Sequence, residues 1–160
     1  YAPPSMRLDL ERFQMLFEVS DDMRRKGLVV VAGDFNRRLD ERPTVIHDPI
    51  TSSEMIFLRK SVDKTCHPVD ARFLELLQNH GLVAINGLES LGEASYTFES
   101  HAWCSVIDYV LLHWESLELA SRWFRVECEA IGTDHHLVAV DLLFQIPMTK
   151  QAMYTGILLL

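Results

Sequence analysis

Short uninterrupted runs of hydrophobic residues recur along this chain and predict β-strands. The clearest covers 28–32, Leu-Val-Val-Val-Ala, and contains no polar residue, which is typical of a strand buried on both faces. The run at 106–114 is rich in β-branched and aliphatic residues. The segment at 124–130 alternates instead, so we expect a half-exposed strand there. The predicted strands are 28–32, 82–85, 95–99, 106–114, 124–130 and 137–144.

Two segments carry apolar residues at helical spacing. The first follows Pro3 and Pro4, which exclude a helix until they are passed, and ends at a basic stretch before Gly27, where cations and a glycine suit a helix terminus. The second covers 71–80, with Asp70 as the expected N-cap. Weaker patterns favour a short helix at 53–58 and one or two helical turns at 115–121. Helices alternating with strands predict an α/β fold.

Two regions predict irregular structure. Residues 37–69 are polar, contain three prolines and show little periodicity, so we expect a long surface connection. Connections of this length in compact domains are often functional. We expect residues 1–144 to form the folded domain and residues 145–160 to form a tail outside its core.

Composition and charge narrow the function classes. The chain of 160 residues is 48% hydrophobic and 24% charged, which fits one globular domain. A net charge of −8 argues against binding nucleic acid through a general basic surface and leaves Arg37-Arg38 as the candidate for a local basic patch. The three cysteines are far apart and indicate neither a disulfide framework nor a zinc site. No apolar run reaches about 18 residues and no leader is evident, so we expect an intracellular protein.

A first cluster of polar residues follows the strand predicted at 28–32. Asp34 and Asn36 come directly after Gly33, at the carboxyl end of the strand, where ligands and catalytic groups gather in open α/β sheets. If the chain stays extended, the two side chains project to the same side. The alternative is turn chemistry that closes a strand, because Asp and Asn are common in turns.

Two further clusters adjoin the strands at 106–114 and 137–144. Asp108 stands in the middle of an apolar run, and an unpaired buried carboxylate costs several kcal/mol, so it needs a partner or lies at a site. Asp134-His135 follow a glycine turn, and histidine is a natural partner because an aspartate fixes its tautomer. A structural ion pair for Asp108 and an N-cap for Asp134 are the alternatives. We expect the three clusters to share one crevice.

These motifs, in this order, resemble the later motifs of the endonuclease/exonuclease/phosphatase superfamily. Within it, Ser-x-Ile-Asp-Tyr-Val is a familiar spelling in the apurinic-type endonuclease domains of non-LTR retrotransposons. Tyr1-Ala2-Pro3 also matches the strand end that carries the active-site tyrosine of the superfamily. The resemblance covers about residues 1–144. Its motifs are Gly33-Asp34-Phe35-Asn36, Tyr96-Thr97-Phe98, Val106-Ile107-Asp108-Tyr109-Val110-Leu111-Leu112 and Gly132-Thr133-Asp134-His135-His136.

The resemblance implies a four-layer α/β/β/α sandwich, similar to DNase I, that hydrolyses phosphodiesters with Mg²⁺ or with Mn²⁺ in its place. Asp134 would lie near the metal, and Tyr1 would touch the phosphate. The segment Tyr96-Thr97-Phe98 is interpreted as sheet packing. Carboxylates for a hard cation together with an amide and a histidine suit phosphoryl transfer, which needs positioning and charge neutralisation.

The remaining roles are carried over in the same way. Asp34 would orient or deprotonate the attacking water, and Asn36 would hold the scissile phosphate. His135 would face the phosphate as a cation or act as a general base, and Asp108 would orient it.

The resemblance is incomplete in its first half. The superfamily has a strand with an asparagine and another with the glutamate that is its main metal ligand, and neither can be placed in this chain. Tyr1 is also not an initiator residue. We therefore expect the carboxyl-terminal portion of a larger domain, with its N-terminal portion missing, poorly stable or inactive alone and part of a longer polyprotein.

The leading hypothesis is a DNA-nicking endonuclease of retroelement type. Its partner is the DNA phosphate backbone, and the nucleus is a candidate compartment. The nick would leave a 3′-hydroxyl able to prime reverse transcription. The alternatives are a superfamily phosphatase or lipid phosphodiesterase and a truncated fragment without catalytic activity.

Overall fold

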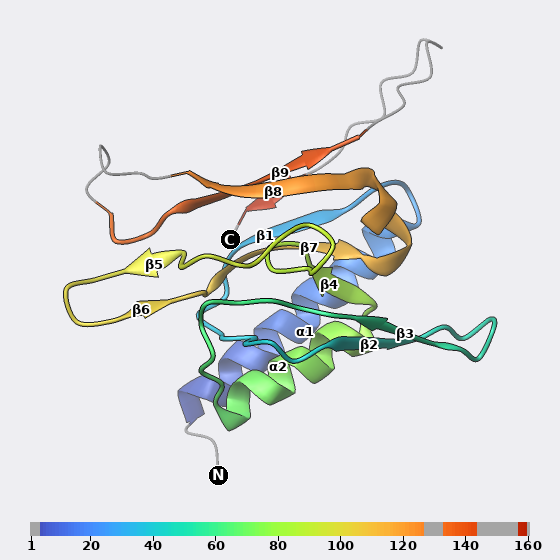
Figure 1. Ribbon diagram of the computed structural model, residues 1–160. Helices are drawn as coiled ribbons and strands as arrows, with labels where there is room; N and C mark the ends of the chain where they lie inside the picture. Colours follow the sequence, from blue (N-terminus) through green and yellow to red (C-terminus); the bar gives the residue numbers. More distant parts are fainter. Residues whose placement is uncertain (1–3, 127–132, 144–156, 160) are drawn as a thin grey trace.

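The computed structural model describes residues 4–126, 133–143 and 157–159, whose main elements form three layers (Figure 1). One layer holds the helices α1 (Pro4–Arg24) and α2 (Pro68–Asn79). The middle layer is a sheet in the order β10 (Ile157–Leu159), β1 (Val30–Asp34), β7 (Asp108–His113) and β4 (Leu82–Ala84). The third layer is the antiparallel hairpin of β8 (Ala120–Val126) and β9 (Leu137–Leu142). The hairpins β2 (Thr44–His47) with β3 (Glu54–Phe57) and β5 (Phe98–Glu99) with β6 (Cys104–Ser105), and a 3₁₀ helix at Trp114–Leu119, lie beside these layers.

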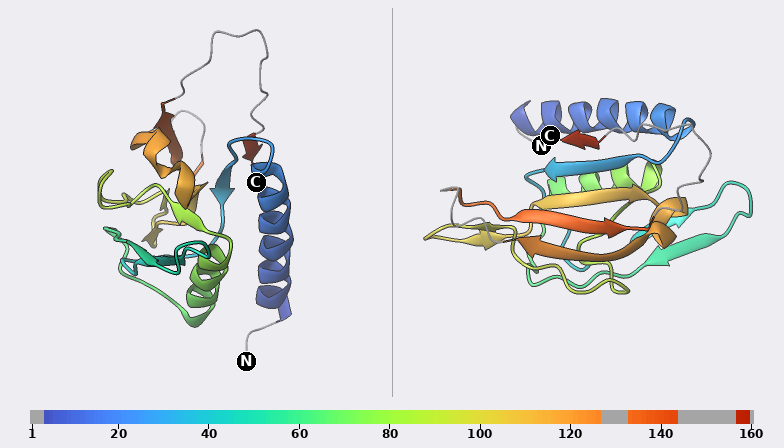
Figure 2. Two further views of the ribbon diagram at one scale, coloured as in Figure 1. Left: turned by 90° about the vertical axis from the view of Figure 1, so that its right-hand side faces the viewer. Right: turned by 90° about the horizontal axis from the view of Figure 1, so that it is seen from above.

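β1 is buried on both faces, as its continuous apolar sequence predicts. Val31 belongs to the core that the sheet forms with α1 and α2, and it is 1% exposed. Its neighbour Val30 points to the opposite face, where it packs in one cluster with Val110 of β7 and Val140 of β9. Figure 2 shows α1 and the β8–β9 hairpin on opposite sides of β1. The strand therefore forms the centre of the molecule.

Phe35 anchors the carboxyl end of β1 in the helical layer. It is 1% exposed, and its ring centroid lies 5.5 Å from that of Phe13 on α1 and 5.5 Å from that of Phe73 on α2. Truncating a buried phenylalanine of this kind to alanine costs about 3–5 kcal/mol. This anchor holds the backbone between Asp34 and Asn36 while both of those residues are exposed.

The predicted strands at 82–85, 95–99, 106–114 and 137–144 are confirmed as β4, β5, β7 and β9 within a few residues. β8 covers Ala120–Val126, and the part of the predicted strand at 127–130 lies outside the described residues. In the described part of the chain, α-helices cover one outer side of the stack, and the four-layer sandwich stays a prediction. Among the described residues, no helix combines the length and apolar character needed to cross a membrane.

The surface connection predicted over most of residues 37–69 contains a hairpin that was not predicted. β2 and β3 pair as an antiparallel hairpin, so the helix predicted at 53–58 is a strand. Glu54-Met55-Ile56-Phe57 alternates between exposed and partly buried side chains, which is the period of a strand, and Met55 and Phe57 pack near Ile46. Arg59 is also buried, with 4% of its surface exposed. The packing of Met55 and Phe57 against the neighbouring strand therefore stabilises a hairpin, even though the surrounding sequence is polar and rich in proline.

Both helices begin earlier than predicted. α1 starts at Pro4. A proline is tolerated in the first turn because its missing N–H would have no hydrogen-bond acceptor within the helix. α2 starts at Pro68 with His67 as its N-cap. Asp70 stands three residues later, where its carboxylate accepts a hydrogen bond from the His67 N–H at 2.9 Å. Asp70 is therefore the reciprocal partner of a capping box, not the N-cap itself.

The described residues of the predicted tail belong to the sheet. Ile157–Leu159 form β10, which pairs in parallel with β1 from Val30 to Ala32. Residues 145–156 lie outside the described part of the chain.

Candidate active site

Asp34 and Asp108 face each other across the sheet at one end of its two central strands. β1 ends at Asp34 and the antiparallel β7 begins at Asp108, and the register pairs these two residues directly. Directly paired residues in an antiparallel sheet have Cβ atoms about 4.5–5.5 Å apart on the same face. Two carboxylates from distant parts of the sequence therefore meet at the strand ends, as the sequence predicts.

Asn36 joins this site through its backbone. Its N–H donates a hydrogen bond to Asp34 Oδ1 at 2.7 Å, and its φ of 48° lies in the left-handed region that asparagine tolerates. The chain is thus turned, not extended, after Asp34, and the expected same-side projection by strand alternation is wrong. The turn alternative describes the local backbone, and both side chains remain exposed at the strand end.

His135 contacts Asp108, as predicted from the sequence. Its Nδ1 lies 3.1 Å from Asp108 Oδ2 and 3.2 Å from Oδ1. Its ring packs edge-on against Phe98, with centroids 5.0 Å apart, and residue 135 forms an isolated bridge with residue 98. The side chain of His135 is 35% exposed, against 16% for Asp108. The partly buried carboxylate thus orients the more exposed imidazole, and an imidazole accessible to a bound molecule can exchange a proton with it.

Burial raises the pKa of Asp108, and the nearby negative charge of Asp34 adds to this increase. Hydrogen bonds from Thr97 and His135 act in the opposite direction without cancelling it. A perturbed carboxyl pKa is found at functional sites and also in structural ion-pair networks.

Thr97 is a site residue that the sequence did not reveal. It is fully buried, and its Oγ1 accepts hydrogen bonds from the backbone N–H groups of Ile107 and Asp108, each at 3.0 Å. Its backbone carbonyl accepts the N–H of His136 at 2.7 Å. One residue thereby ties the start of β7 to the turn that carries His135. The only sign of this role in the sequence is a polar residue between two aromatic residues, a pattern that predicts sheet packing.

Asp134 does not join the other predicted site residues. Within the described residues, its carboxylate makes no hydrogen bond or ion pair with Asp34, Asp108 or His135, and its backbone carbonyl accepts the N–H of Glu99 at 2.9 Å. No group of three or more His, Cys, Asp or Glu side chains in the described part of the chain could hold a metal ion. The described residues therefore do not fit a complete Mg²⁺ site. Tyr1 lies outside them.

The basic patch expected at Arg37-Arg38 is not exposed. Arg37 is 6% exposed and donates to the backbone carbonyl of Asn36 at 2.8 Å. The Arg38 side chain is 17% exposed, pairs with Asp63 at 3.5 Å and lies over the ring of Trp103 at 5.3 Å. Both guanidinium groups are used within the protein, so they do not form a free basic surface.

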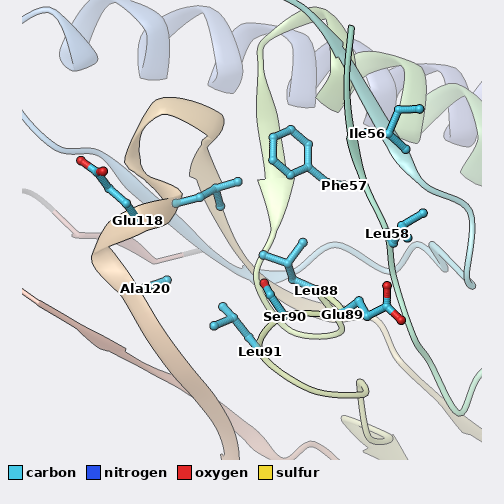
Figure 3. A pocket seen from close by; sticks show the side chains of 10 residues that line it. Ile56, Phe57, Leu58, Leu88, Glu89, Ser90, Leu91, Glu118 and Ala120 are labelled. Atoms are coloured by element: carbon cyan, nitrogen blue, oxygen red, sulfur yellow. The ribbon is translucent and has the colours of Figure 1, made fainter.

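A separate apolar pocket of about 530 Å³ lies away from these residues (Figure 3). Phe57, Leu88 and Leu91 contribute to its lining, and Glu118 and Glu89 stand at its sides. None of Asp34, Asn36, Asp108 or His135 lines this pocket. The candidate active site is instead a group of polar side chains at the strand ends.

No protein-family model matches the chain, and a search of curated proteins returns no match for it. The function is therefore inferred from the motifs and from the geometry of the site. That geometry offers an oriented histidine, an accessible carboxylate on Asp34 and a carboxyl on Asp108 whose pKa is raised by burial, which are groups suited to proton transfer.

Proposed function

We propose that the chain is the carboxyl-terminal portion of a Mg²⁺-dependent domain of the endonuclease/exonuclease/phosphatase superfamily and that it nicks DNA as part of a longer polyprotein. The observation that carries the proposal is the contact between His135 Nδ1 and Asp108, directly beside Asp34 in the sheet register. The motifs that supply these three residues are far apart in sequence, and the superfamily uses the same residue types in the same order.

Each residue contributes one part of phosphodiester hydrolysis. Asp34 orients the attacking water or accepts its proton, since its carboxylate is exposed at the strand end. Asp108 holds the imidazole of His135 in place, and His135 Nε2 faces the reacting phosphate as a cation or a base. The Asn36 side chain, also exposed, contacts the scissile phosphate.

The metal requirement depends on donors beyond the described residues. Mg²⁺ is usually held by one or two carboxylates and several waters, and Asp34 and Asp134 supply carboxylates of the right type. The described residues contain no group of three or more such ligands. A glutamate-bearing strand of the same domain, provided by another segment, would complete the ligand set. The net charge of −8 limits DNA contact to the neighbourhood of the site, and the nucleus is the compartment proposed for a protein with a DNA substrate.

Nicking of supercoiled plasmid in the presence of Mg²⁺ tests this function. The wild-type chain is expressed together with whatever coding sequence precedes Tyr1 in its reading frame, and Asp34→Asn is compared with Asp48→Asn. Asp48 is a matched control because its Oδ1 accepts the N–H of Ile50 at 2.8 Å, the same turn hydrogen bond that Asp34 makes.

We expect Asp34→Asn to lower the nicking rate about 100-fold or more and Asp48→Asn to leave it unchanged. Equal loss in both variants would show that the effect comes from removing a turn carboxylate in general and not from the chemistry of Asp34. Phosphate release from inositol phosphates without nicking would contradict the nuclease and favour a superfamily phosphatase. Absence of both activities in the wild type would favour a fragment without catalytic function.

A further inference from the structure

Asn86 is a fully buried polar residue whose side chain binds the backbone of β7 on both sides of the residue after Asp108. Its Nδ2 donates to the carbonyl oxygen of Asp108 at 2.9 Å, and its Oδ1 accepts the N–H of Val110 at 3.2 Å. A side-chain amide that both donates and accepts in this way replaces one rung of a β-ladder. Asn86 thus extends the pairing of β4 with β7 beyond the last residue of β4.

The backbone leaves the sheet directly after Asn86, which explains why a side chain takes over. The last backbone bond between the two segments runs from the Ile85 N–H to the Val110 carbonyl at 2.8 Å. Gly87 then has a φ of +90°, and a Cβ there would lie 2.8 Å from Ala94 Cβ and 2.8 Å from the Lys60 carbonyl oxygen. The two residues therefore have separate roles. Gly87 allows the backbone to leave the sheet, and Asn86 makes two hydrogen bonds to the backbone of β7.

We propose that Asn86 is a positioning residue, whose amide fixes the backbone of Asp108 and through it the contact between the Asp108 carboxylate and His135. Asp108 is then held from two sides, because its N–H donates to Thr97 Oγ1 and its carbonyl accepts from Asn86 Nδ2. The part of this inference that concerns nicking rests on the proposed function. The part that concerns the orientation of His135 does not.

The isosteric variant Asn86→Asp tests the donor without changing the volume of the side chain. It retains an acceptor for the Val110 N–H, whereas a carboxylate oxygen would then face the Asp108 carbonyl oxygen and repel it. Asn86→Ser is the neutral companion, because its hydroxyl is too short to make both bonds. Both variants are compared with Asn79→Asp, which adds the same charge at an exposed position at the end of α2.

The first readout is the ring signals of His135 and His80 in ¹H–¹³C NMR spectra. We expect both Asn86 variants to move the His135 signals and to leave the His80 signals within the spread of repeated spectra, while Asn79→Asp leaves His135 in place. If Asn86→Asp does not fold, Asn86→Ser decides the question. Unmoved His135 signals in a folded Asn86→Ser protein, or a displacement in the charged variant alone, would overturn the inference.

The second readout is a double-mutant cycle on plasmid nicking. We expect Asn86→Asp to lower kcat about 10- to 100-fold with little change in KM, since it misplaces reacting groups without removing a substrate contact. In an Asp108→Asn background the same change should have little further effect, because Asn86 acts through Asp108. Independent, multiplying effects would contradict positioning. A wild-type protein that does not nick would contradict the proposed function alone, and the NMR result would then decide the role of Asn86.

Discussion

Two histidines of this chain contact an aspartate through Nδ1, and the pairs differ in which partner is buried. In the His80–Asp21 pair the contact is 2.7 Å, the His80 side chain is 10% exposed and the Asp21 side chain is 37% exposed. In the His135–Asp108 pair the contact is 3.1 Å, and the order is reversed, with 35% exposure for the histidine and 16% for the aspartate.

The difference separates a structural tie from a site that can do chemistry. His80 is the C-cap residue of α2, its ring lies 5.7 Å from that of Phe17, and its contact with Asp21 joins α2 to α1. The His135 ring is instead partly exposed at the surface, and its Nδ1 contacts the less exposed carboxyl of Asp108. An imidazole that exchanges protons with a ligand must be accessible to it, so only the second arrangement suits catalysis.

Removing His135 should lower the activity strongly, whereas removing His80 should leave it nearly unchanged. We expect His135→Ala to lower the rate of plasmid nicking about 10²- to 10⁴-fold, the usual contribution of a general acid or base, and His80→Ala to leave the rate near that of the wild type. Initial nicking rates, measured well below the unfolding temperature of each variant, give the comparison. A similar loss in both variants would show that the two pairs do not differ in function.

Stability should respond in the reverse order. We expect His80→Ala to lower the free energy of unfolding by about 2 kcal/mol, because it removes a mostly buried side chain and its hydrogen bond to a carboxylate. His135→Ala should cost less than about 1 kcal/mol, since its ring is one-third exposed. Urea unfolding of both variants measures these values, and a larger loss in His135→Ala would contradict the assignment of His80 as the structural tie.

The pH dependence of unfolding tests the burial of Asp108. Burial raises the pKa of Asp108, so the Asp108 carboxyl stays protonated in the folded chain at pH values where it is already ionised in the unfolded chain. The contribution of Asp108 to stability therefore falls as the pH rises from about 4 through the folded-state pKa. Asp108→Asn has no such dependence, and its stability relative to the wild type should increase over that interval. Urea unfolding at several pH values checks this; a relative stability that decreases with pH would be the opposite of the expected result.

The smallest effect should come from the exposed member of the structural pair. Asp21→Asn keeps a hydrogen-bond acceptor for His80 and removes a charge that is 37% exposed. We expect a loss of about 0.5 kcal/mol, as for a surface ion pair, and no change in nicking. Urea unfolding in low and high salt measures it, and a loss that persists in high salt would mean that the charge itself is not the cause.

The sequence predicted the core strands and the meeting of distant site residues for physical reasons. The run 28–32 has no polar residue, so it had to be buried on both faces, and Val30 and Val31 are. A carboxylate inside an apolar strand had to find a partner, and Asp108 contacts His135. Such predictions succeed because burial of charge and of apolar surface has a large free-energy cost or gain.

Other features depended on tertiary contacts that no local pattern contains. The hairpin at 44–57 was predicted as loop and short helix, because Met55 and Phe57 show their period only against Ile46 and the strand beside it. Thr97 was predicted to serve sheet packing, and Asn86 belongs to none of the three predicted clusters of site residues. Their hydrogen bonds reach β7, which follows them by more than nine residues, so their roles could not be inferred from neighbours in the sequence.

The most direct test of the candidate active site is a matched pair of double variants in the plasmid-nicking experiment. One combines Asp34→Asn with His135→Ala. The other combines Asp48→Asn with His80→Ala, which removes the carboxylate charge at the equivalent turn and the structural histidine. We expect no detectable nicking by the first variant and a rate near that of the wild type for the second. Equal nicking by the two folded double variants would contradict this expectation.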